Sequence, residues 1–507
     1  MSEPPAAPTG PDLGRGVPAS SLAEGVMLLG HVGGEPVILA RSGGVLHAVG
    51  ALCTHYHALL SDGLLADGVV HCPWHHARFC LKTGEALGAP AIEPLTCWRV
   101  EDEAGTIFVR HVSAAPSPGA HARRPDAPRR IVVIGGGGAG FAAAERLRRE
   151  GYDGELTLLS ADVDAPYDRP NCSKDYLAGA APREWMPLKD AAYYADNAID
   201  LRTSTAVRSL DLSGRTVTLL DGADLAFDAL ILATGAAPVR PPVPGFDRPN
   251  VYILRSLADC ETIIQAASHS RRVAIIGASF IGLEVAAALI DRKLDVAVIA
   301  PEAIPLAKIL GEDIGRAVQA LHESEGVVFY LGRTAVGFPD GSVVLDDGTA
   351  VPADMVVLGV GVRPETGLAM IAGLAVDHGV IVGADLQTAA PGVFAVGDVA
   401  RYPDPRSPGV LIHVEHWAAA QRQGQHAARV ILGQADRFTD PPFFWSAHYD
   451  MVISYVGHAE GFDAARVDGD IAGGDATVRF TREGRLLAAA TLGRDIDSLK
   501  IELDFAR

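Results

Sequence analysis

Two short segments near the N-terminus each pair a cysteine with a histidine. Cys53-Thr54-His55 has the spacing C-x-H, and Cys72-Pro73-Trp74-His75 has the spacing C-x-x-H. In a Rieske [2Fe–2S] centre, two thiolates hold one iron and two neutral imidazoles hold the other. A tetrahedral zinc site takes the same residue types, but zinc sites usually group the cysteines together and the histidines together. The alternating order therefore predicts a Rieske cluster held by Cys53, His55, Cys72 and His75.

The neighbours of these four residues predict a low reduction potential. High-potential Rieske loops carry a further cysteine pair, whose places are taken here by Ala58 and Trp74, and Phe79 stands where a tyrosine often donates. Because hydrogen bonds to the sulfurs stabilise the reduced cluster, losing them lowers the potential to roughly −150 mV. We expect His57 and His76 to be solvated loop residues, with a place at the exposed edge of the cluster as the alternative.

Composition argues against several classes of protein. The 507 residues carry a formal net charge of −19, which disfavours nucleic acid or an anionic membrane as the main partner. No run of about 18 apolar residues occurs, so no transmembrane helix is predicted, and the N-terminus lacks the pattern of a signal peptide. Six cysteines are too few for a disulfide scaffold. We therefore expect a multi-domain protein of the cytoplasm.

The spacing of apolar residues divides the chain into an all-β part and α/β parts. From about residue 25 to residue 112, short apolar runs alternate with Gly and Asp turns, which is typical of a β domain. A segment rich in Ala, Pro, Gly and Ser then predicts a linker. A strand, a glycine turn and a helix follow one another twice, at 130–150 and 272–292, which predicts two nucleotide-binding domains. Short strands return near residue 438 and predict a small α+β domain.

The first glycine turn, Gly135-Gly136-Gly137-Gly138-Ala139-Gly140, satisfies G-x-G-x-x-G between a strand and a helix. Gly135 allows the tight turn, Gly137 lets the backbone approach a pyrophosphate, and Gly140 permits close packing of the helix on the strand. The helix N-terminus then binds the phosphates. An acid about twenty residues further on usually binds the ribose. Asp162 is the candidate, with a plain turn residue as the alternative.

The second glycine turn is less complete. Gly277 and Gly282 keep the first and last glycines, but Ser279 replaces the middle one and adds bulk near the pyrophosphate. The strand that follows ends at Ala300, where an acid that selects NAD usually stands, and Glu302 is the candidate to replace it. Since no arginine cluster follows to hold a 2′-phosphate, NADH is favoured and NADPH remains possible.

Together these motifs resemble the FAD-dependent pyridine nucleotide oxidoreductase superfamily. More closely, the chain is similar to apoptosis-inducing-factor-like proteins with an N-terminal Rieske domain, and to the ferredoxin reductases of bacterial dioxygenase systems. The resemblance implies a Rieske domain at 12–112, a linker at 113–128 and an FAD-binding domain at 129–243 and 367–436. It further implies an NAD(P)H-binding domain at 244–366 and a reductase-type domain at 437–507.

The resemblance also implies roles for single residues. Pro166-Tyr167-Asp168-Arg169-Pro170, followed by Ser173-Lys174, is similar to a segment beside the FAD of the family. Arg169 would contact the FAD, and Lys174 would lie near the flavin N5. Glu284 resembles the acid that pairs with this lysine, and the pair would keep Lys174 charged beside a flavin that gains negative charge on reduction. Two unrelated surface charges are the alternative.

Further segments complete the implied FAD site. Ala233-Thr234-Gly235 resembles the strand that closes the first FAD segment, and Val396-Gly397-Asp398 resembles the second FAD signature, in which Asp398 binds the ribityl chain. Glu415-His416-Trp417 resembles the segment that passes the isoalloxazine ring. Phe444-Trp445 resembles an aromatic pair that faces the flavin, so Thr234, Gly235 and Trp445 are also assigned to FAD binding.

These assignments predict a reductase that moves electrons from NAD(P)H through FAD to the Rieske cluster and on to an acceptor protein. Disulfide reductases of the superfamily need two close cysteines beside the flavin, and we expect Cys172 to have no such partner. A Rieske oxygenase would need a mononuclear iron site, and a nitrite reductase would need four clustered cysteines for its [4Fe–4S] cluster. The alternative that stays open is a redox-responsive signalling protein with slow NADH oxidation.

Overall fold

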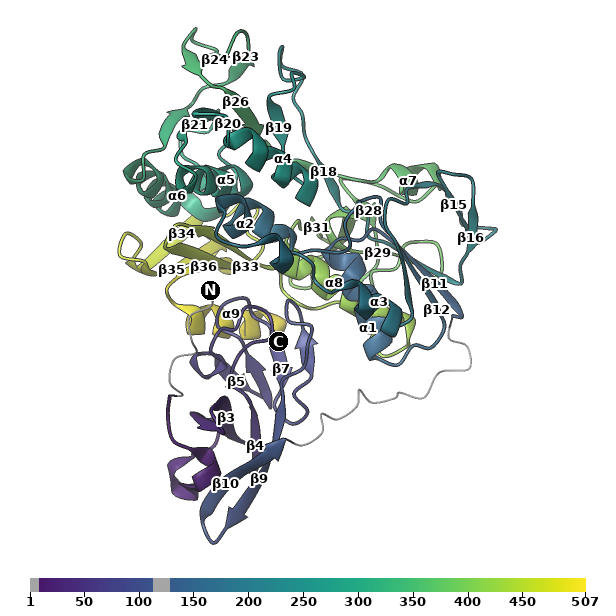
Figure 1. Cartoon of the computed structure of the whole chain (residues 1–507), viewed down its shortest axis with the longest axis vertical. Coiled ribbons are helices and arrows are strands. Elements are labelled where there is room, and N and C mark those ends of the chain that lie inside the picture. The colour runs from purple at the N-terminus through teal and green to yellow at the C-terminus, as the bar shows by residue number, and fades with distance from the viewer. Residues whose placement is uncertain (1–8, 113–127) are drawn as a thin grey trace. The chain divides into compact units, whose positions relative to one another are not determined.

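The computed structural model describes residues 9–112 and 128–507 (Figure 1). The predicted linker, 113–128, lies outside the described residues except for its last position, and so does the segment 1–8. The chain divides into two compact units. The first comprises residues 1–125, 145–153 and 495–507, and the second comprises 126–144 and 154–494.

The first unit contains two β-sheets. A six-stranded antiparallel sheet has the order β1-β10-β9-β4-β3-β2 and a four-stranded sheet has the order β5-β6-β7-β8. The strands are β1 (Val17–Pro18), β2 (Met27–Val32), β3 (Glu35–Ser42), β4 (Val45–Gly50), β5 (Leu64–Ala66), β6 (Val69–His71), β7 (Arg78–Cys80), β8 (Ala86–Gly88), β9 (Cys97–Glu103) and β10 (Thr106–Val112). The predicted all-β N-terminal domain is therefore confirmed.

Strand β3 is buried on both faces because its apolar residues serve two cores. Successive side chains of a strand point to opposite faces. Val37 and Leu39 pack in one apolar cluster with Trp98, while Ile38 and Ala40 pack in the other with Phe79 and the two cluster-loop cysteines. The continuous apolar run thus anchors the six-stranded sheet to the loops that carry the predicted iron ligands.

The second unit begins with a parallel sheet of order β13-β12-β11-β17-β29. Its strands are β11 (Arg130–Ile134), β12 (Glu155–Leu159), β13 (Ile199–Arg202), β17 (Ala229–Leu232) and β29 (Val393–Ala395). Because β29 comes from much later in the chain, this sheet combines strands from two distant parts of the sequence. Helix α1 (Gly138–Arg149) starts within the glycine turn at 135–140.

A second parallel sheet has the order β19-β26-β20-β21-β22. Its strands are β19 (Val251–Ile253), β20 (Arg272–Ile276), β21 (Asp295–Ala300), β22 (Val328–Leu331) and β26 (Met355–Leu358). Figure 1 shows α4 (Leu257–Ala267) and α5 (Phe280–Asp291) beside these strands. Helix α5 starts at Phe280, directly after Ser279, whose side chain caps it. Helix α6 (Ala307–Ser324) follows β21.

Shorter sheets accompany the two parallel ones, and their strand pairs are antiparallel except for β28 with β30, which is parallel. Their strands are β14 (Val207–Asp211), β15 (Thr216–Leu219), β16 (Asp224–Ala226), β18 (Ala236–Pro238), β23 (Ala335–Gly337), β24 (Ser342–Leu345), β25 (Ala350–Pro352), β27 (Val362–Pro364), β28 (Val380–Ile381), β30 (Ala400–Pro403) and β31 (Leu411–His413). Helix α8 (Trp417–Ile431) then leads into the C-terminal part of the chain.

The C-terminal part forms an antiparallel sheet of order β32-β33-β36-β35-β34, yellow in Figure 1. Its strands are β32 (Phe443–His448), β33 (Met451–Gly457), β34 (Ala464–Asp470), β35 (Asp475–Arg482) and β36 (Arg485–Leu492). Helix α9 (Asp495–Ala506) follows and belongs to the first compact unit. Within the described residues, no helix combines the length and apolar character that a membrane crossing requires.

Helix α8 packs closely against the first turn of α1 because its middle contains a glycine. A Cβ atom on Gly424 would lie 2.1 Å from the carbonyl oxygen of Ala139, a backbone atom of the glycine turn. We predict that Gly424→Ala forces the two helices apart, lowers the free energy of unfolding by about 1–3 kcal/mol and reduces the FAD that copurifies. Thermal unfolding and the flavin-to-protein absorbance ratio measure both effects.

Gly367, the first residue of α7 (Gly367–Ile371), provides the matched control, because a Cβ there meets nothing within 4 Å. Gly367→Ala should leave both the melting temperature and the flavin content at their wild-type values. A Gly424→Ala protein that matches it would show that the close helix contact does not shape the FAD site.

Candidate functional site

The predicted iron ligands lie on two similar loops of the first unit. The backbone N–H of Cys53 donates to the Ala58 carbonyl at 2.9 Å, and the N–H of Cys72 donates to the Ala77 carbonyl at 2.8 Å. Each cysteine thus closes a turn with the residue five positions on, which brings the histidine inside the turn. Both cysteines are about 1% exposed and belong to the same apolar cluster.

The two histidines meet through the nitrogens that would bind iron. His55 Nδ1 and His75 Nδ1 are 3.1 Å apart. Two nitrogens bonded to one metal ion at about 2.1 Å each lie about 3 Å apart when the angle at the metal is near ~95°. Burial lowers the pKa of His55 to about 4, which favours the neutral imidazole that a metal ion requires. The histidine pair therefore fits one iron of a Rieske cluster.

The two cysteine thiols are hydrogen-bonded to each other, and each sulfur also accepts from backbone N–H groups. A hydrogen bond shared with Cys72, together with burial, raises the pKa of the Cys53 thiol, and the same hydrogen bond lowers the pKa of Cys72. Backbone N–H groups of His55 and Tyr56 donate to the Cys53 sulfur. Those of His75 and Trp74 donate to Cys72. Such donors stabilise negative charge on cluster sulfurs, so the loops supply amide hydrogen bonds even though Phe79 offers none.

His57 and His76 occupy equivalent positions in the two loops, and both have a left-handed backbone, with φ of +59° and +57°. His57 is exposed, as predicted. The expectation that His76 is solvated is wrong, because its side chain is fully buried and its Nδ1 lies 2.7 Å from Glu502 Oε2 of α9. The carboxylate of a residue more than 400 positions away holds the second loop, a contact that spacing alone does not reveal.

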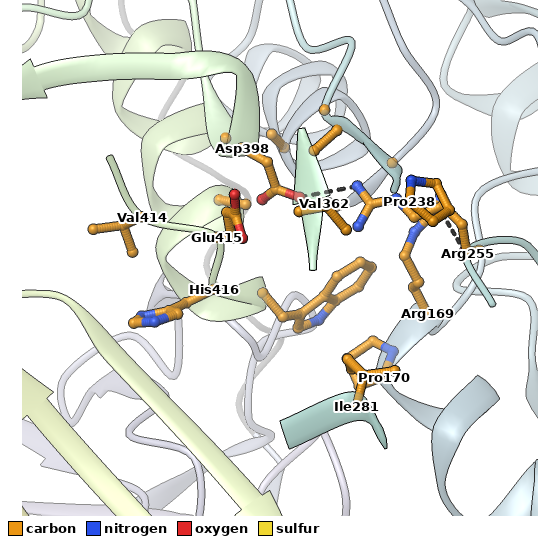
Figure 2. Close-up of a pocket in the computed structure, with 18 of the residues that line it drawn as sticks. Arg169, Pro170, Pro238, Arg255, Ile281, Val362, Asp398, Val414, Glu415 and His416 are labelled. Atoms are coloured by element: carbon orange, nitrogen blue, oxygen red, sulfur yellow. Dashed lines mark hydrogen bonds and ion pairs between the residues drawn. The ribbon is translucent and has the colours of Figure 1, made fainter. Parts of the chain in front are cut away.

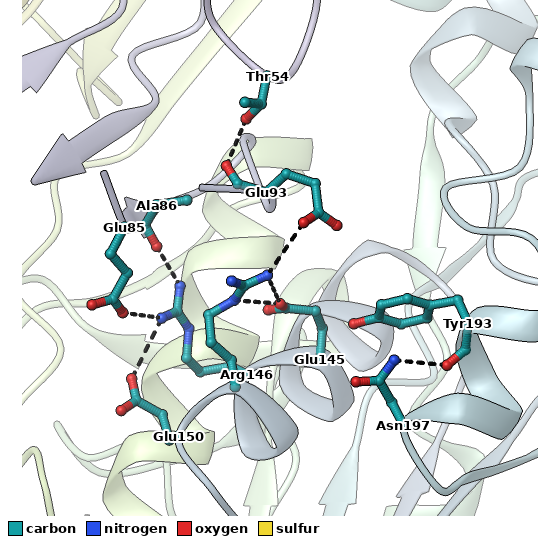
Figure 3. Close-up of polar contacts among 10 residues, drawn as sticks. Thr54, Glu85, Ala86, Glu93, Glu145, Arg146, Glu150, Tyr193 and Asn197 are labelled. Carbon is teal, nitrogen blue, oxygen red and sulfur yellow. Dashed lines mark hydrogen bonds and ion pairs between the residues drawn. The ribbon is translucent and has the colours of Figure 1, made fainter. Parts of the chain in front are cut away.

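Polar contacts also hold other segments of the first unit together, and one of them involves a ligand loop (Figure 3). The Thr54 hydroxyl donates to the Glu93 carbonyl at 2.8 Å. The fully buried Arg146, in the last part of α1, donates to the Ala86 carbonyl at 2.7 Å and to Glu85 at 3.1 Å. The cost of burying this guanidinium is offset by these two bonds and by Glu150 at 3.4 Å.

The second unit contains a cavity of about 1460 Å³, larger than the typical range of roughly 300–1,000 Å³ for a small-molecule site. Most of the residues assigned to FAD line it: Gly135, Gly137, Asp162, Arg169, Lys174, Thr234, Gly235, Asp398, Glu415, His416, Trp417 and Trp445. Residues from the FAD-type segments, from α5 and from the C-terminal sheet thus share one cavity. Its size and lining fit a dinucleotide cofactor with a second ligand beside it.

The first glycine turn has the geometry expected of a phosphate-binding turn. Gly135 has a φ of +117°, and a Cβ there would lie 2.1 Å from the Ala233 carbonyl oxygen. Gly137 faces open space, with only the Arg169 guanidinium at 3.9 Å. Gly140 lies behind the cavity, where a Cβ would meet the Gly135 carbonyl at 1.9 Å. The turn therefore presents its backbone and one arginine to a ligand.

An ion pair fixes the acid of the second FAD signature. Arg255 Nη2 donates to Asp398 Oδ2 at 2.9 Å, as the dashed line in Figure 2 shows. His413 Nε2 lies 2.7 Å from the Asp398 carbonyl. Burial raises the pKa of the neighbouring Glu415 and lowers the pKa of His416 to about 3. Arg255 was not predicted, because no motif spacing marks its position 143 residues before Asp398.

Lys174 and Glu284 form a true ion pair. Lys174 Nζ donates to Glu284 Oε2 at 2.7 Å, and the Ser173 hydroxyl donates to the same oxygen at 2.6 Å. The other oxygen, Oε1, accepts from Ser446 of β32 at 2.7 Å. Glu284 is only 4% exposed, so the alternative of two unrelated surface charges is wrong. No motif marks Ser446 beyond its place next to Phe444-Trp445.

The second glycine turn differs from the first in how its helix begins. Ser279 Oγ accepts from the Gly282 N–H at 3.2 Å and donates to the Gly359 carbonyl at 2.8 Å. The serine thus caps α5 itself. Ser279 lines the cavity, whereas Gly277, Gly282 and Glu302 do not. Glu302 lies 3.9 Å from Lys308, a cavity residue, so its ribose contact stays a prediction.

The expectation that Cys172 has no cysteine partner is wrong. Helix α4 brings Cys260 to it, and the Cys260 thiol donates to the Cys172 carbonyl at 3.2 Å. Both residues are buried in one apolar cluster and both are free. The hydrogen bond with Cys260 and burial raise the pKa of Cys172. Because the thiolate is the reactive form, this environment disfavours disulfide exchange despite the proximity.

Comparison with known proteins identifies three matching families along the chain. The family described as pyridine nucleotide-disulphide oxidoreductase matches residues 129–424. The Rieske [2Fe–2S] domain family matches residues 16–99, and the reductase C-terminal family matches residues 443–502. The Rieske match covers most strands of the first unit, the oxidoreductase match covers the two parallel sheets, and the C-terminal match covers the last antiparallel sheet.

Individual relatives cover most of the chain. Apoptosis-inducing factor 3 of Homo sapiens is 31% identical over 497 residues, which is 94% of this chain and 80% of the relative. The ferredoxin–NAD(+) reductase component of the anthranilate 1,2-dioxygenase system of Burkholderia cepacia is 36% identical over 73% of this chain and 93% of its own length. A putidaredoxin reductase, solved in covalent complex with putidaredoxin, superposes with a TM-score of 0.71 at 32% identity, covering 75% of this chain and 93% of its own.

The loop geometry predicts that cluster and flavin can be lost separately. Cys72→Ser should abolish the EPR signal of the reduced cluster, because a serine oxygen is a poor substitute for a thiolate on iron. Flavin absorbance and its bleaching by NADH should persist, because Cys72 does not line the cavity of the second unit.

Cys97→Ser is the matched control, since Cys97 is a buried free thiol of the same apolar cluster outside the two loops. It should retain the cluster signal. A Cys72→Ser protein with an intact Rieske signal would contradict the ligand assignment, and loss of the signal in both variants would indicate misfolding of the domain.

Proposed function

We propose that this chain, a member of the pyridine nucleotide-disulphide oxidoreductase family with an N-terminal Rieske domain, delivers electrons from NAD(P)H to a separate acceptor protein. Its cofactors are FAD and a [2Fe–2S] cluster, and it is an NAD(P)H-dependent flavoprotein reductase related to ferredoxin reductases. The fold class, cofactors and enzyme class expected from the sequence are therefore confirmed. The domain boundaries, the individual site residues and the acceptor belong to the proposal.

The observation that carries the proposal is the Lys174–Glu284 ion pair at the wall of the cavity. Bound FAD accepts a hydride and releases electrons singly, which allows a two-electron donor to serve one-electron carriers. Lys174 places a positive charge at the cavity, and Glu284 holds it there. Asp398, oriented by Arg255, accepts hydrogen bonds from the ligand. Phe444 and Trp445 exclude water beside them.

The acceptor is proposed to be an electron-transfer protein. Several relatives have names that describe reductases of ferredoxins, and one solved relative is joined to putidaredoxin. Disulfide reductases of the superfamily pass electrons to a pair of cysteines beside the flavin. In this chain that route is disfavoured, because Cys172 and Cys260 are buried and the pKa of Cys172 is raised. The fused cluster supplies one-electron output instead.

The choice of nucleotide and the cellular compartment complete the proposal. NADH is the preferred donor, because no arginine cluster follows β21 and Glu302 is available for the ribose. The protein works in the cytoplasm, because the thiolates that bind iron and the free cysteines of the described residues suit a reducing compartment. A stopped-flow comparison of NADH and NADPH measures the first feature directly.

An anaerobic titration with NADH, followed by absorbance and EPR, tests the proposed electron path. We predict that NADH bleaches the flavin first and that the EPR signal of the reduced Rieske cluster appears afterwards. The expected reduction potential of the cluster is at the low end of the Rieske range, so the cluster should be reduced after the flavin. Flavin bleaching without any Rieske signal would contradict transfer from FAD to the cluster.

The signalling alternative makes a different prediction for the same protein. A redox sensor would oxidise NADH very slowly and keep a long-lived complex of NAD⁺ with reduced flavin. A reductase would turn over rapidly with cytochrome c or a ferredoxin as acceptor. Steady-state rates with these acceptors, compared with the lifetime of the charge-transfer absorbance, therefore separate the two functions.

A further inference from the structure

The last helix of the chain contributes a buried carboxylate to the second ligand loop. Glu502 of α9 is 5% exposed, and its Oε2 lies 2.7 Å from Nδ1 of the fully buried His76. An ionised carboxylate only accepts, so the Nδ1–H of His76 donates to it. The Rieske family match ends at residue 99. Glu502 therefore lies outside the segment by which that domain is recognised.

Helix α9 is fixed in the first unit by one buried face. Its buried residues are Ser498, Leu499, Ile501, Glu502 and Phe505. Positions 498, 502 and 505 are three or four residues apart, so they lie on the same side of the helix. Apolar neighbours on this side, such as Phe505, are also buried. Glu502 thus lies within an anchored face, and its position does not depend on the loop that it contacts.

His76 occupies the place in the loop from which both neighbours are controlled. The residue before it, His75, is a predicted iron ligand. The residue after it, Ala77, accepts the hydrogen bond from the Cys72 N–H at 2.8 Å that closes the turn. A restraint on His76 therefore limits the movement of the imidazole ligand on one side and of the cysteine turn on the other.

The backbone of His76 is in a conformation that needs support. Its φ is +57°, and a residue with a side chain stays in this left-handed region when its surroundings determine it. The buried imidazole and its bond to Glu502 provide such surroundings. His57, at the equivalent place of the first loop, has a φ of +59° but is exposed. That loop is held through Thr54, whose hydroxyl donates to the Glu93 carbonyl at 2.8 Å.

A second carboxylate of α9 acts on the same loop. Burial raises the pKa of Asp495, the first residue of the helix, and an electrostatic interaction with His76 lowers it. The charge of Asp495 in turn raises the pKa of Cys72. These mutual effects place the start of α9, as well as Glu502, within electrostatic range of the second ligand loop.

We propose that α9 is part of the iron–sulfur site and that Glu502 is a positioning residue for the second pair of ligands. Acting through His76, Glu502 holds the loop of Cys72 and His75 in the shape that binds the cluster. The proposal rests on the assignment of these two residues as iron ligands. The iron–sulfur site thus combines loops from the first fifth of the chain with a side chain from its last helix.

Two replacements of Glu502 separate this role from others. In Glu502→Gln, the amide oxygen can still accept from the Nδ1–H of His76. In Glu502→Ala, that buried donor loses this acceptor, which is costly unless the loop moves. Positioning through the hydrogen bond predicts that glutamine keeps the wild-type behaviour and that alanine loses it. A role of the carboxylate charge alone predicts that both variants change alike.

The first measurement follows the cluster in the full chain with FAD and cluster bound. EPR records the g values after reduction by dithionite, and an iron chelator then removes iron from the oxidised protein. In Glu502→Ala, we expect iron release to be about tenfold faster or more. We also expect a broadened EPR signal, because the geometry of the ligand loop varies among molecules. Glu502→Gln should match the wild type in both properties.

The second measurement reports the loop itself, whether or not a variant retains its cluster. Hydrogen exchange followed by mass spectrometry compares the backbone amides of residues 72–77 with those of strand β3. In Glu502→Ala, the amides of 72–77 should exchange about tenfold faster, while β3 stays protected. Equally faster exchange of β3 would overturn the proposal, because Glu502 would then stabilise the whole domain rather than this loop.

Asp504→Ala is the matched control on the same helix. Asp504 pairs with Arg507 at 3.8 Å, and their side chains are 72% and 70% exposed. An ion pair in such a place contributes little to stability. This variant should keep the wild-type iron release, EPR signal and exchange rates. A Glu502→Ala protein that matches it, or a Glu502→Gln protein that fails like Glu502→Ala, would overturn the proposal.

These measurements are independent of electron delivery from NAD(P)H, because dithionite reduces the cluster directly. Failure of NADH to bleach the wild-type flavin would contradict the proposed function and leave the test of Glu502 intact. A Rieske signal that persists in Cys72→Ser would contradict the ligand assignment. Hydrogen exchange of residues 72–77 would then still show whether Glu502 holds the loop.

Discussion

The second unit is organised around one buried carboxylate. Glu284 is 4% exposed, and an ion in such a place is stable only if hydrogen bonds replace its lost water. Three donors do so: Ser173, Lys174 and Ser446. They come from the segment beside the glycine turn and from the C-terminal sheet, while the acceptor sits on α5. One charge therefore sets the relative positions of three parts of the unit.

This requirement explains why the C-terminal sheet belongs to the catalytic unit. Phe444 packs between Tyr455, at a ring-centroid distance of 4.9 Å, and Phe280 of α5, also at 4.9 Å. The apolar contacts supply most of the stabilisation in such an interface, but they tolerate sliding. The hydrogen bond from Ser446 to Glu284 does not, because a shift would leave a buried charge unsatisfied. Apolar packing thus stabilises the interface between the C-terminal sheet and α5, and the buried carboxylate fixes their relative position.

Features that depend on local spacing could be predicted from the sequence. The loops of the predicted iron ligands and the turn at Gly135 follow from residue types a few positions apart, and the structure brings the residues of each together. Features that depend on distant pairing could not. The partners Glu502 for His76, Ser446 for Glu284 and Cys260 for Cys172 lie 426, 162 and 88 positions away. In each case the side chain meets its partner only because separate elements pack together.

The prediction for Ser279 was incomplete for a related reason. Its motif position suggested a slightly bulky version of a phosphate-binding glycine. The structure shows that the hydroxyl has its own hydrogen bonds, to the Gly282 N–H and the Gly359 carbonyl. A serine can satisfy a helix N-terminus by itself, and whether it does so depends on the loop at Gly359, which the motif does not include.

This difference between the two turns has a consequence for how the two nucleotides bind. The net charge of −19 opposes anionic ligands, and cations of the cavity such as Lys174 and Arg255 are already paired with acids. Phosphates must therefore rely on backbone N–H groups. The first turn presents Gly137 and Arg169 to the cavity, whereas the N-terminus of α5 already uses Ser279 as its cap. The first turn is thus suited to a cofactor that stays bound, and the second to a nucleotide that binds, reacts and leaves.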